Sequence, residues 1–144
     1  MKEFSYKLVS SDKELKSAFE VRRQVFVEEQ GISKELELDE YDREALHMVA
    51  KDKERVIGTA RIRFLVTDKA KLERMAVLKH FRRRSIGRGI ISFLIEELRK
   101  RQVKQLLLHA QYSVAAFYRS CGLEESGLPF WEAGIKHIKM QRRI

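Results

Sequence analysis

Residues Lys71–Arg101, KLERMAVLKHFRRRSIGRGIISFLIEELRKR, contain the elements from which the fold can be inferred. Its first part, 71–77, is typical of a strand, and its last part, 87–101, has the apolar spacing of an amphipathic helix. A loop with four arginines and two glycines lies around the junction. The apolar stripe of the helix is formed by Ile90, Ile91, Leu94, Ile95 and Leu98. A strand that leads through a loop into such a helix predicts an α/β fold with a crossover connection.

The same loop is a candidate phosphate site. The first amides of a helix have no partner inside the helix, and the helix dipole places partial positive charge there. Gly87 and Gly89 would let a phosphate approach the backbone, and the arginines would add full charges. The loop is not a P-loop, because Ile90 and Ile91 follow the second glycine. It also differs from the dinucleotide fingerprint, because Ser92 occupies the position of the third glycine or alanine.

Composition narrows the classes of partner. The 144 residues carry a formal net charge of +9, which favours an anionic partner such as nucleic acid, an anionic membrane face or a phosphorylated cofactor. The single cysteine, Cys121, cannot form an internal disulfide. A chain with only one cysteine fits the reducing cytoplasm, where we expect the protein to be located. The sequence lacks a membrane-spanning apolar run, a Cys/His zinc spacing and an aromatic RNA-binding consensus. We therefore expect no membrane span and no metal, and nucleic acid is a less favoured partner.

The remaining periodicities predict the other elements. We expect strands at 4–9, 46–50, 56–65, 105–110 and 136–142, and helices from residue 11 or 12 to about 28 and over 114–120. The acid-rich segment 33–44 is expected to be a short helix or a loop, and segment 123–134 is expected to be irregular. The result is one α/β domain over residues 1–144 with a mixed, mostly antiparallel central sheet and helices on both faces.

Two motifs and the order of elements resemble the GCN5-related N-acetyltransferase (GNAT) family. The first motif is Arg/Gln-x-x-Gly-x-Gly/Ala, present as Arg84-Ser85-Ile86-Gly87-Arg88-Gly89. The second is an aromatic-Tyr pair on a helix that ends at a glycine, present as Phe117-Tyr118-Arg119-Ser120-Cys121-Gly122-Leu123. The similarity of element order extends from about Ser5 to Met140, and segments 108–111 and 132–140 look like the ElaA/YjcF-type branch. The resemblance implies the single-domain GNAT fold.

The resemblance also implies a reaction and a set of site residues. It implies an acetyl-CoA-dependent N-acetyltransferase that moves an acetyl group to a primary amine by direct attack in a ternary complex. Backbone amides before residue 90 would hold the pyrophosphate, the strand ending at Val77 would pair with the pantetheine, and Tyr118 would assist the leaving thiolate. The expected cofactor-binding residues are Met75, Ala76, Val77, Arg83, Arg84, Ser85, Ile86, Gly87, Arg88, Gly89, Ile90, Gln111 and Tyr118.

Attack by an amine also requires a base, because an amine with a pKa of 10.4 is neutral in only about one in 2,500 molecules at pH 7. We predict Glu73 as the catalytic base, with His109, Glu132 and His137 as rivals. We expect Gly89→Val to block cofactor binding by placing atoms where the phosphate lies.

Several points stay open at the level of sequence. The acceptor, a small-molecule or peptide amine, cannot be read from the residues, and a homodimer is one option for the assembly. One alternative to the enzyme is a CoA-binding sensor without turnover. The other is a nucleic-acid-binding module that uses a basic stripe formed by Arg82–Arg84, Arg88, Arg99–Arg101 and Lys104.

Overall fold

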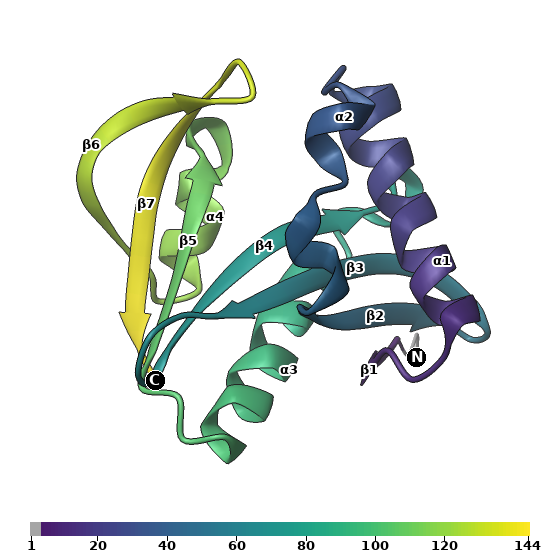
Figure 1. Ribbon diagram of the computed structural model, residues 1–144, viewed down its shortest axis with the longest axis horizontal. Helices are drawn as coiled ribbons and strands as arrows, with labels where there is room; N and C mark the ends of the chain where they lie inside the picture. The colour runs from purple at the N-terminus through teal and green to yellow at the C-terminus, as the bar shows by residue number, and fades with distance from the viewer. Residues whose placement is uncertain (1–3) are drawn as a thin grey trace.

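The computed structural model describes residues 4–144 and is built on one seven-stranded sheet with the order β1-β2-β3-β4-β5-β7-β6 (Figure 1). All neighbouring strands are antiparallel except β4 and β5, which are parallel. The predicted mixed, mostly antiparallel sheet is therefore confirmed. The strands are β1 (Ser5–Leu8), β2 (Leu46–Asp52), β3 (Arg55–Phe64), β4 (Lys69–Val77), β5 (Gln105–Gln111), β6 (Glu124–Glu132) and β7 (Ile135–Arg143).

Helices cover both faces of the sheet, with α1 and α2 on one face and α3 and α4 on the other (Figure 1). The α-helices are α1 (Asp12–Arg22), α2 (Lys34–Glu37), α3 (Ile86–Lys100) and α4 (Ala115–Ser120). Short 3-10 helices are η2 (Glu40–Arg43), η3 (Lys79–Phe81) and η4 (Tyr112–Val114). The predicted helix up to about residue 28 is confirmed in its extent, but its second half, Arg23–Glu29 (η1), is a π-helix. No helix within residues 4–144 is long and apolar enough to cross a membrane.

The strand–loop–helix unit forms the centre of the core. Every residue of the predicted apolar stripe of α3 is buried, and the helix contacts β1, β3 and β4. The three consecutive leucines 106–108 of β5 are also buried, as expected for a strand covered on both faces. The core thus fixes the start of α3 against the end of β4.

The prediction that segment 123–134 is irregular is wrong. Residues Glu124–Glu132 form β6, which pairs with β7 at the edge of the sheet. Its register shifts between Ser126 and Phe130, where Gly127 has a positive φ of 83° and Pro129 cannot donate a ladder hydrogen bond. An edge strand tolerates both features, and they hide the alternation of side chains that would have identified a strand.

Strand β4 contains a bulge and then separates from β5. Arg61 lies opposite Glu73 but Thr59 lies opposite Ala76, so β4 has one residue more than β3 in this interval. Pairing of β4 with β5 covers only 69–72 and 105–108. Beyond these residues the two strands diverge, which opens the gap that is visible between β4 and β5 in Figure 1.

Candidate functional site

A cleft of about 1130 Å³ opens where β4 and β5 separate. Its lining comes from the second half of β4, the loop before α3, the first turn of α3, helix α4 and the ends of β5, β6 and β7. Of the predicted site residues, those that line the cleft are Glu73, Met75, Ala76, Val77, Arg83, Ser85, Ile86, Gly87, Arg88, Gln111 and Tyr118. Residues far apart in the sequence therefore meet at one opening.

The loop before α3 presents backbone amides at this opening. Ser85, the N-cap residue, has a left-handed conformation with φ 64° and ψ 18°, and Arg83 has φ 64°. The amide of Gly89 already donates to the Ser85 carbonyl at 3.0 Å, so the amides that begin the helix at residues 86–88 are the ones left open by the helix geometry. Amides gathered in this way form a concave site for an anion.

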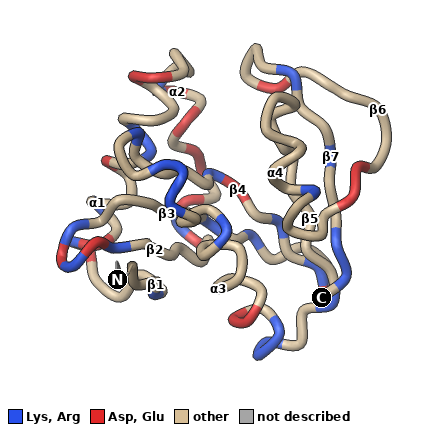
Figure 2. The backbone as a smooth tube through the Cα atoms, turned by 180° about the vertical axis from the view of Figure 1, so that it is seen from behind, with Lys and Arg blue, Asp and Glu red and all other residues tan. Residues whose placement is uncertain are grey.

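The arginines of the loop have different surroundings. Arg88 lines the cleft and donates to the hydroxyl of Ser120 at 2.8 Å. The guanidinium of Arg84, the residue at the motif position, lies 5.5 Å from the centroid of the Phe81 ring and is not part of the cleft lining. Arg82 forms an ion pair with Glu29 at 2.6 Å. The charge seen around this loop in Figure 2 is therefore partly neutralised within the chain.

The two glycines of the loop have different neighbours. A Cβ atom on Gly87 would lie 3.1 Å from Cζ of Phe117, a residue of the cleft. A Cβ atom on Gly89 would lie 2.1 Å from the hydroxyl of Tyr6 in β1, on the side of the core. Ile90 is fully buried. Neither Gly89 nor Ile90 lines the cleft. A side chain on Gly89 would collide with Tyr6, so the geometry argues against the predicted reason for an effect of Gly89→Val.

The end of β5 is tied to the opposite wall of the cleft. The side-chain amide of Gln111 donates to the side-chain carbonyl of Gln30 at 2.8 Å. Gln30 follows η1, so this hydrogen bond joins the two sides of the opening. On the β4 side, the Val77 carbonyl accepts a hydrogen bond from Nε of Arg82 at 2.9 Å.

Tyr118 projects from α4 and lines the cleft. Its ring is half-buried and packs edge-to-face on Phe117, with ring centroids 5.1 Å apart. Burial raises the pKa of Tyr118, with a smaller contribution from the buried Cys121. The phenol therefore stays protonated at neutral pH and is available as a hydrogen-bond donor.

Glu73 is held by three cations. It accepts hydrogen bonds from Arg61 at 2.7 Å and from Nε of Arg63 at 2.9 Å, and Nζ of Lys71 lies 2.9 Å from its other oxygen. Burial alone would raise the pKa of Glu73, but the hydrogen bonds from Arg63, Lys71 and Arg61 outweigh burial and lower it to about 2. A carboxylate with so low a pKa is a weak base at neutral pH, so the geometry argues against the predicted role of Glu73 as the general base.

Glu132 of β6 lies between two histidines. Its carboxylate oxygens are 3.7 Å from Nδ1 of His109 and 3.7 Å from Nε2 of His137. The neighbouring His109 lowers the pKa of Glu132, and burial opposes this effect. Nδ1 of His137 lies 2.7 Å from the Ile135 carbonyl, so it carries the ring proton and donates. In the described part of the chain, Nδ1 of His109 is buried without a hydrogen-bond partner.

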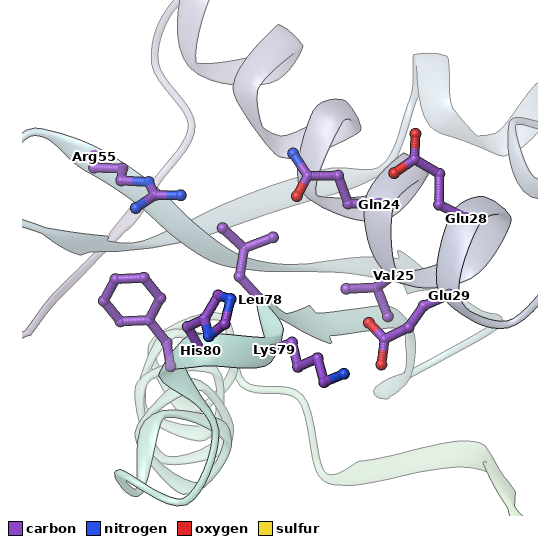
Figure 3. Close-up of a pocket in the computed structure, with 9 residues that line it drawn as sticks. Gln24, Val25, Glu28, Glu29, Arg55, Leu78, Lys79 and His80 are labelled. Atoms are coloured by element: carbon purple, nitrogen blue, oxygen red, sulfur yellow. The ribbon is translucent and has the colours of Figure 1, made fainter.

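A second, smaller hollow lies outside the cleft. It has a volume of about 310 Å³ and lies between η1 and the segment that follows β4 (Figure 3). Its two carboxylates are already neutralised, Glu28 by Arg23 and Glu29 by Arg82. Among residues 4–144, no group of three or more His, Cys, Asp or Glu side chains is arranged to hold a metal ion. The large cleft is therefore the candidate site.

Comparisons with known proteins identify the family of the chain. The chain matches the family model described as "Acetyltransferase (GNAT) domain" over residues 6–144. "Uncharacterized N-acetyltransferase YjcF" of Bacillus subtilis (strain 168) is 35% identical over 136 residues, which cover 94% of this chain and 96% of that protein. The crystal structure of Escherichia coli ElaA matches with a TM-score of 0.84 at 24% identity and covers 99% of both chains. PaiA N-acetyltransferase from Thermoplasma acidophilum, solved in complex with coenzyme A, matches with a TM-score of 0.76 at 16% identity over 99% of both chains.

Proposed function

This chain belongs to the GNAT acetyltransferase family, in the branch of ElaA and YjcF, and from that premise we propose that it transfers the acetyl group of acetyl-CoA to a primary amine. The observation that carries this proposal is the cleft itself. The open amides at the start of α3 and the unpaired edge of β4 face the same space, together with Tyr118. Together these features suit an extended ligand that carries phosphate at one end and amide groups along its length.

The proposed cofactor pose follows from these two features. The amides at residues 86–88 bind the pyrophosphate of acetyl-CoA, and the side chains of Arg83 and Arg88, which also line the cleft, contribute positive charge. The edge of β4 over Met75–Val77 pairs with the amides of the pantetheine arm, as an added strand would.

The proposed chemistry is a direct transfer. The lone pair of the neutral amine attacks the thioester carbonyl carbon, a C–N bond forms, and the C–S bond breaks as CoA leaves. The hydroxyl of Tyr118 donates a hydrogen bond to the sulfur, and this bond strengthens as negative charge develops there. Because the pKa of Tyr118 is raised, the phenol remains a hydrogen-bond donor and complete proton transfer from it is not required.

We assign the base to the cluster of His109, Glu132 and His137 in place of Glu73. A histidine has an ordinary pKa near neutrality and can accept the proton that the amine releases. Glu132, 3.7 Å from Nδ1 of His109, would stabilise the charged ring that results. His109 is therefore the proposed base and Glu132 its orienting partner.

Binding and transfer test this proposal separately. In thermal unfolding, acetyl-CoA and CoA should stabilise the protein by about 2.7 kcal/mol at a hundredfold excess over Kd, whereas ATP should not. Mass spectrometry should then show acetylation of members of an amine panel in the presence of acetyl-CoA. Tyr118→Phe should lower kcat about 10- to 100-fold with little change in the Kd of CoA, since one hydrogen bond to a developing charge is lost.

Other outcomes separate the alternatives. Binding of CoA without transfer to any amine would favour a sensor without turnover. Tight, salt-dependent binding of nucleic acid with no effect of CoA on unfolding would favour the basic binding module and would overturn the proposal.

A further inference from the structure

We propose that the acceptor amine carries an acidic group, as an amino acid does, and that Arg63 and Lys71 bind that group. This proposal rests on the proposed acetyl transfer and names the class of acceptor. It follows from the arrangement of charged side chains at the end of the cleft away from the amide site.

The strand register places these side chains on one face of the sheet. Arg63 lies opposite Lys71 across β3 and β4, and Lys71 lies beside Leu107 across β4 and β5. Side chains alternate along a strand, so Lys71 and His109 lie on the same face. Gln111 lies opposite His137, which continues this face into β7. This end of the cleft is therefore lined by two groups of strands, which we call its two walls: β3 with β4, and β5 with β6 and β7.

The wall on β3 and β4 has an excess of positive charge. Glu73 is the one carboxylate within 4.0 Å of either Arg63 or Lys71 in the described part of the chain, and it is also bonded by Arg61. Arg61 has further acidic partners in Asp39 and Asp42. Arg63 and Lys71 thus share one carboxylate, Glu73, which also pairs with Arg61. The side chains of Arg63 and Lys71 line the cleft and are 23% and 13% exposed.

Arg63 is held in a defined position for a ligand. Its Nε and Nη2 atoms donate to the two oxygens of Glu73 at 2.9 and 3.1 Å. Its guanidinium lies 3.9 Å from the centroid of the Tyr41 ring, another residue of the cleft. A planar guanidinium that is stacked and hydrogen-bonded loses little freedom when it binds a carboxylate or a phosphate with its remaining N–H groups.

The opposite wall suits the amine. Glu132 provides a negative charge, and His109 beside it is the proposed base. His137 lies on the other side of Glu132. Arg63 and Lys71 line the same cleft as His109, Glu132 and His137. One small molecule with an amine at one end and an acid at the other can therefore span both walls.

Matched pairs of acceptors test this inference. β-Alanine is compared with propylamine, and O-phosphoethanolamine with ethanolamine, by measuring kcat/KM for acetyl transfer. We expect the acidic member of at least one pair to be preferred about 10- to 100-fold, the range of a charge-assisted hydrogen bond. The pair that shows the preference identifies the acidic group as a carboxylate or a phosphate.

Variants assign the preference to residues. Arg63→Gln should reduce the ratio of acidic to neutral kcat/KM about tenfold or more, mainly through KM, and Arg63→Lys should keep part of it because the charge remains. Arg55→Gln, an arginine of the same strand that lies outside the cleft, should leave the ratio unchanged. Stabilisation of each variant by CoA confirms that it is folded.

The possible failures are distinguishable. Equal or better use of the neutral amines, or an unchanged ratio in Arg63→Gln, overturns the assignment of an acidic acceptor and leaves the acetyltransferase proposal standing. Failure of every amine, acidic or neutral, to accept the acetyl group overturns both.

Discussion

Gly87 and Gly89 lie two positions apart in the first turn of α3, yet they serve different neighbours. Two positions in an α-helix differ by about 200° around the axis, so they point to nearly opposite sides. Gly87 faces the cleft beside Phe117 and Met75, and Gly89 leaves room for the ring of Tyr6. Each position therefore requires a small residue for its own reason. Gly87 leaves the cleft open to a ligand, and Gly89 makes room for the packing of β1.

A double-mutant cycle tests the role of Gly89. Gly89→Ala should lower the free energy of unfolding by about 1–3 kcal/mol, because its Cβ would meet the Tyr6 hydroxyl at 2.1 Å. In a Tyr6→Ala background the same change should cost much less or be stabilising, since the collision is gone and alanine favours the helix. Urea unfolding of the four proteins measures the coupling, and additive effects would contradict the packing role. Gly87→Ala is the matched control. Its loss of binding free energy for CoA should exceed its loss of unfolding free energy.

Glu73 makes stability depend on pH. Its pKa is lowered from 4.5 to about 2 in the folded protein, so the unfolded chain takes up the proton first as the pH falls. The stability that its ion pairs provide is therefore complete above about pH 4.5 and is lost between that pH and about 2, with an upper limit of about 3 kcal/mol. Glu73→Gln should be less stable than the parent at pH 7, and the difference should shrink from pH 5 to pH 3. Urea unfolding at these values measures it, and a constant difference would contradict the ion-pair account.

At the scale of elements, the bulge in β4 links the strand to α2. Arg74 has a positive φ of 55°, and its guanidinium donates to the carbonyls of Leu36 at 3.1 Å and Glu37 at 3.0 Å and pairs with Asp39 at 3.0 Å. A bulge commonly redirects a side chain in this way. The element that shapes one wall of the cleft is therefore held by the strand that is proposed to bind the cofactor.

Two substitutions of Arg74 separate backbone strain from this link. Arg74→Ala and Arg74→Gly both remove the contacts to α2, but glycine adopts a positive φ with less strain. The glycine variant should therefore be more stable than the alanine variant by about 1 kcal/mol in thermal unfolding. Hydrogen exchange should become faster over residues 34–39 in both variants. Slow exchange there in either variant would show that α2 is held by other contacts.

At the scale of the whole molecule, the sheet consists of two parts that share a short seam. Strands β1 to β4 form one part, and β5, β7 and β6 form the other, with β4 and β5 paired only over 69–72 and 105–108. At the open end the hydrogen bond between Gln111 and Gln30 bridges the gap. Lys and Arg residues are concentrated along the backbone at the loop before α3 and at the far end of that helix (Figure 2). Only the first of these two basic regions borders the cleft.

A ligand bound in the gap between β4 and β5 should therefore slow hydrogen exchange in both parts of the sheet. We expect acetyl-CoA to slow hydrogen exchange at 75–77 in β4 and at 109–111 in β5, because the pantetheine would lie between these edges. Exchange mass spectrometry with saturating acetyl-CoA measures the effect, and ATP serves as the control for simple phosphate binding. Protection confined to residues 83–88 would show that only the phosphates are bound and would contradict the proposed pose.

The strand–loop–helix unit, the order of most elements and the family motifs could be predicted from the sequence. These features depend on local spacing, since apolar periodicity, glycine placement and capping are properties of neighbours along the chain. The α3 stripe and the buried leucines of β5 were predictable for this reason. The edge strand β6 was not, because Gly127 and Pro129 break its alternation and its pairing with β7 supplies the missing order.

Which chemical groups are available to a ligand depends on the tertiary structure. Glu73 looked like a base in the sequence, but three cations from β3 and β4 hold it charged. Gly89 looked like a phosphate contact, but Tyr6 from β1 occupies the space beside it. Glu132 has two histidine neighbours because β5, β6 and β7 lie side by side in the sheet. The physical reason is that ionisation and steric access depend on neighbours in space, which local spacing does not specify.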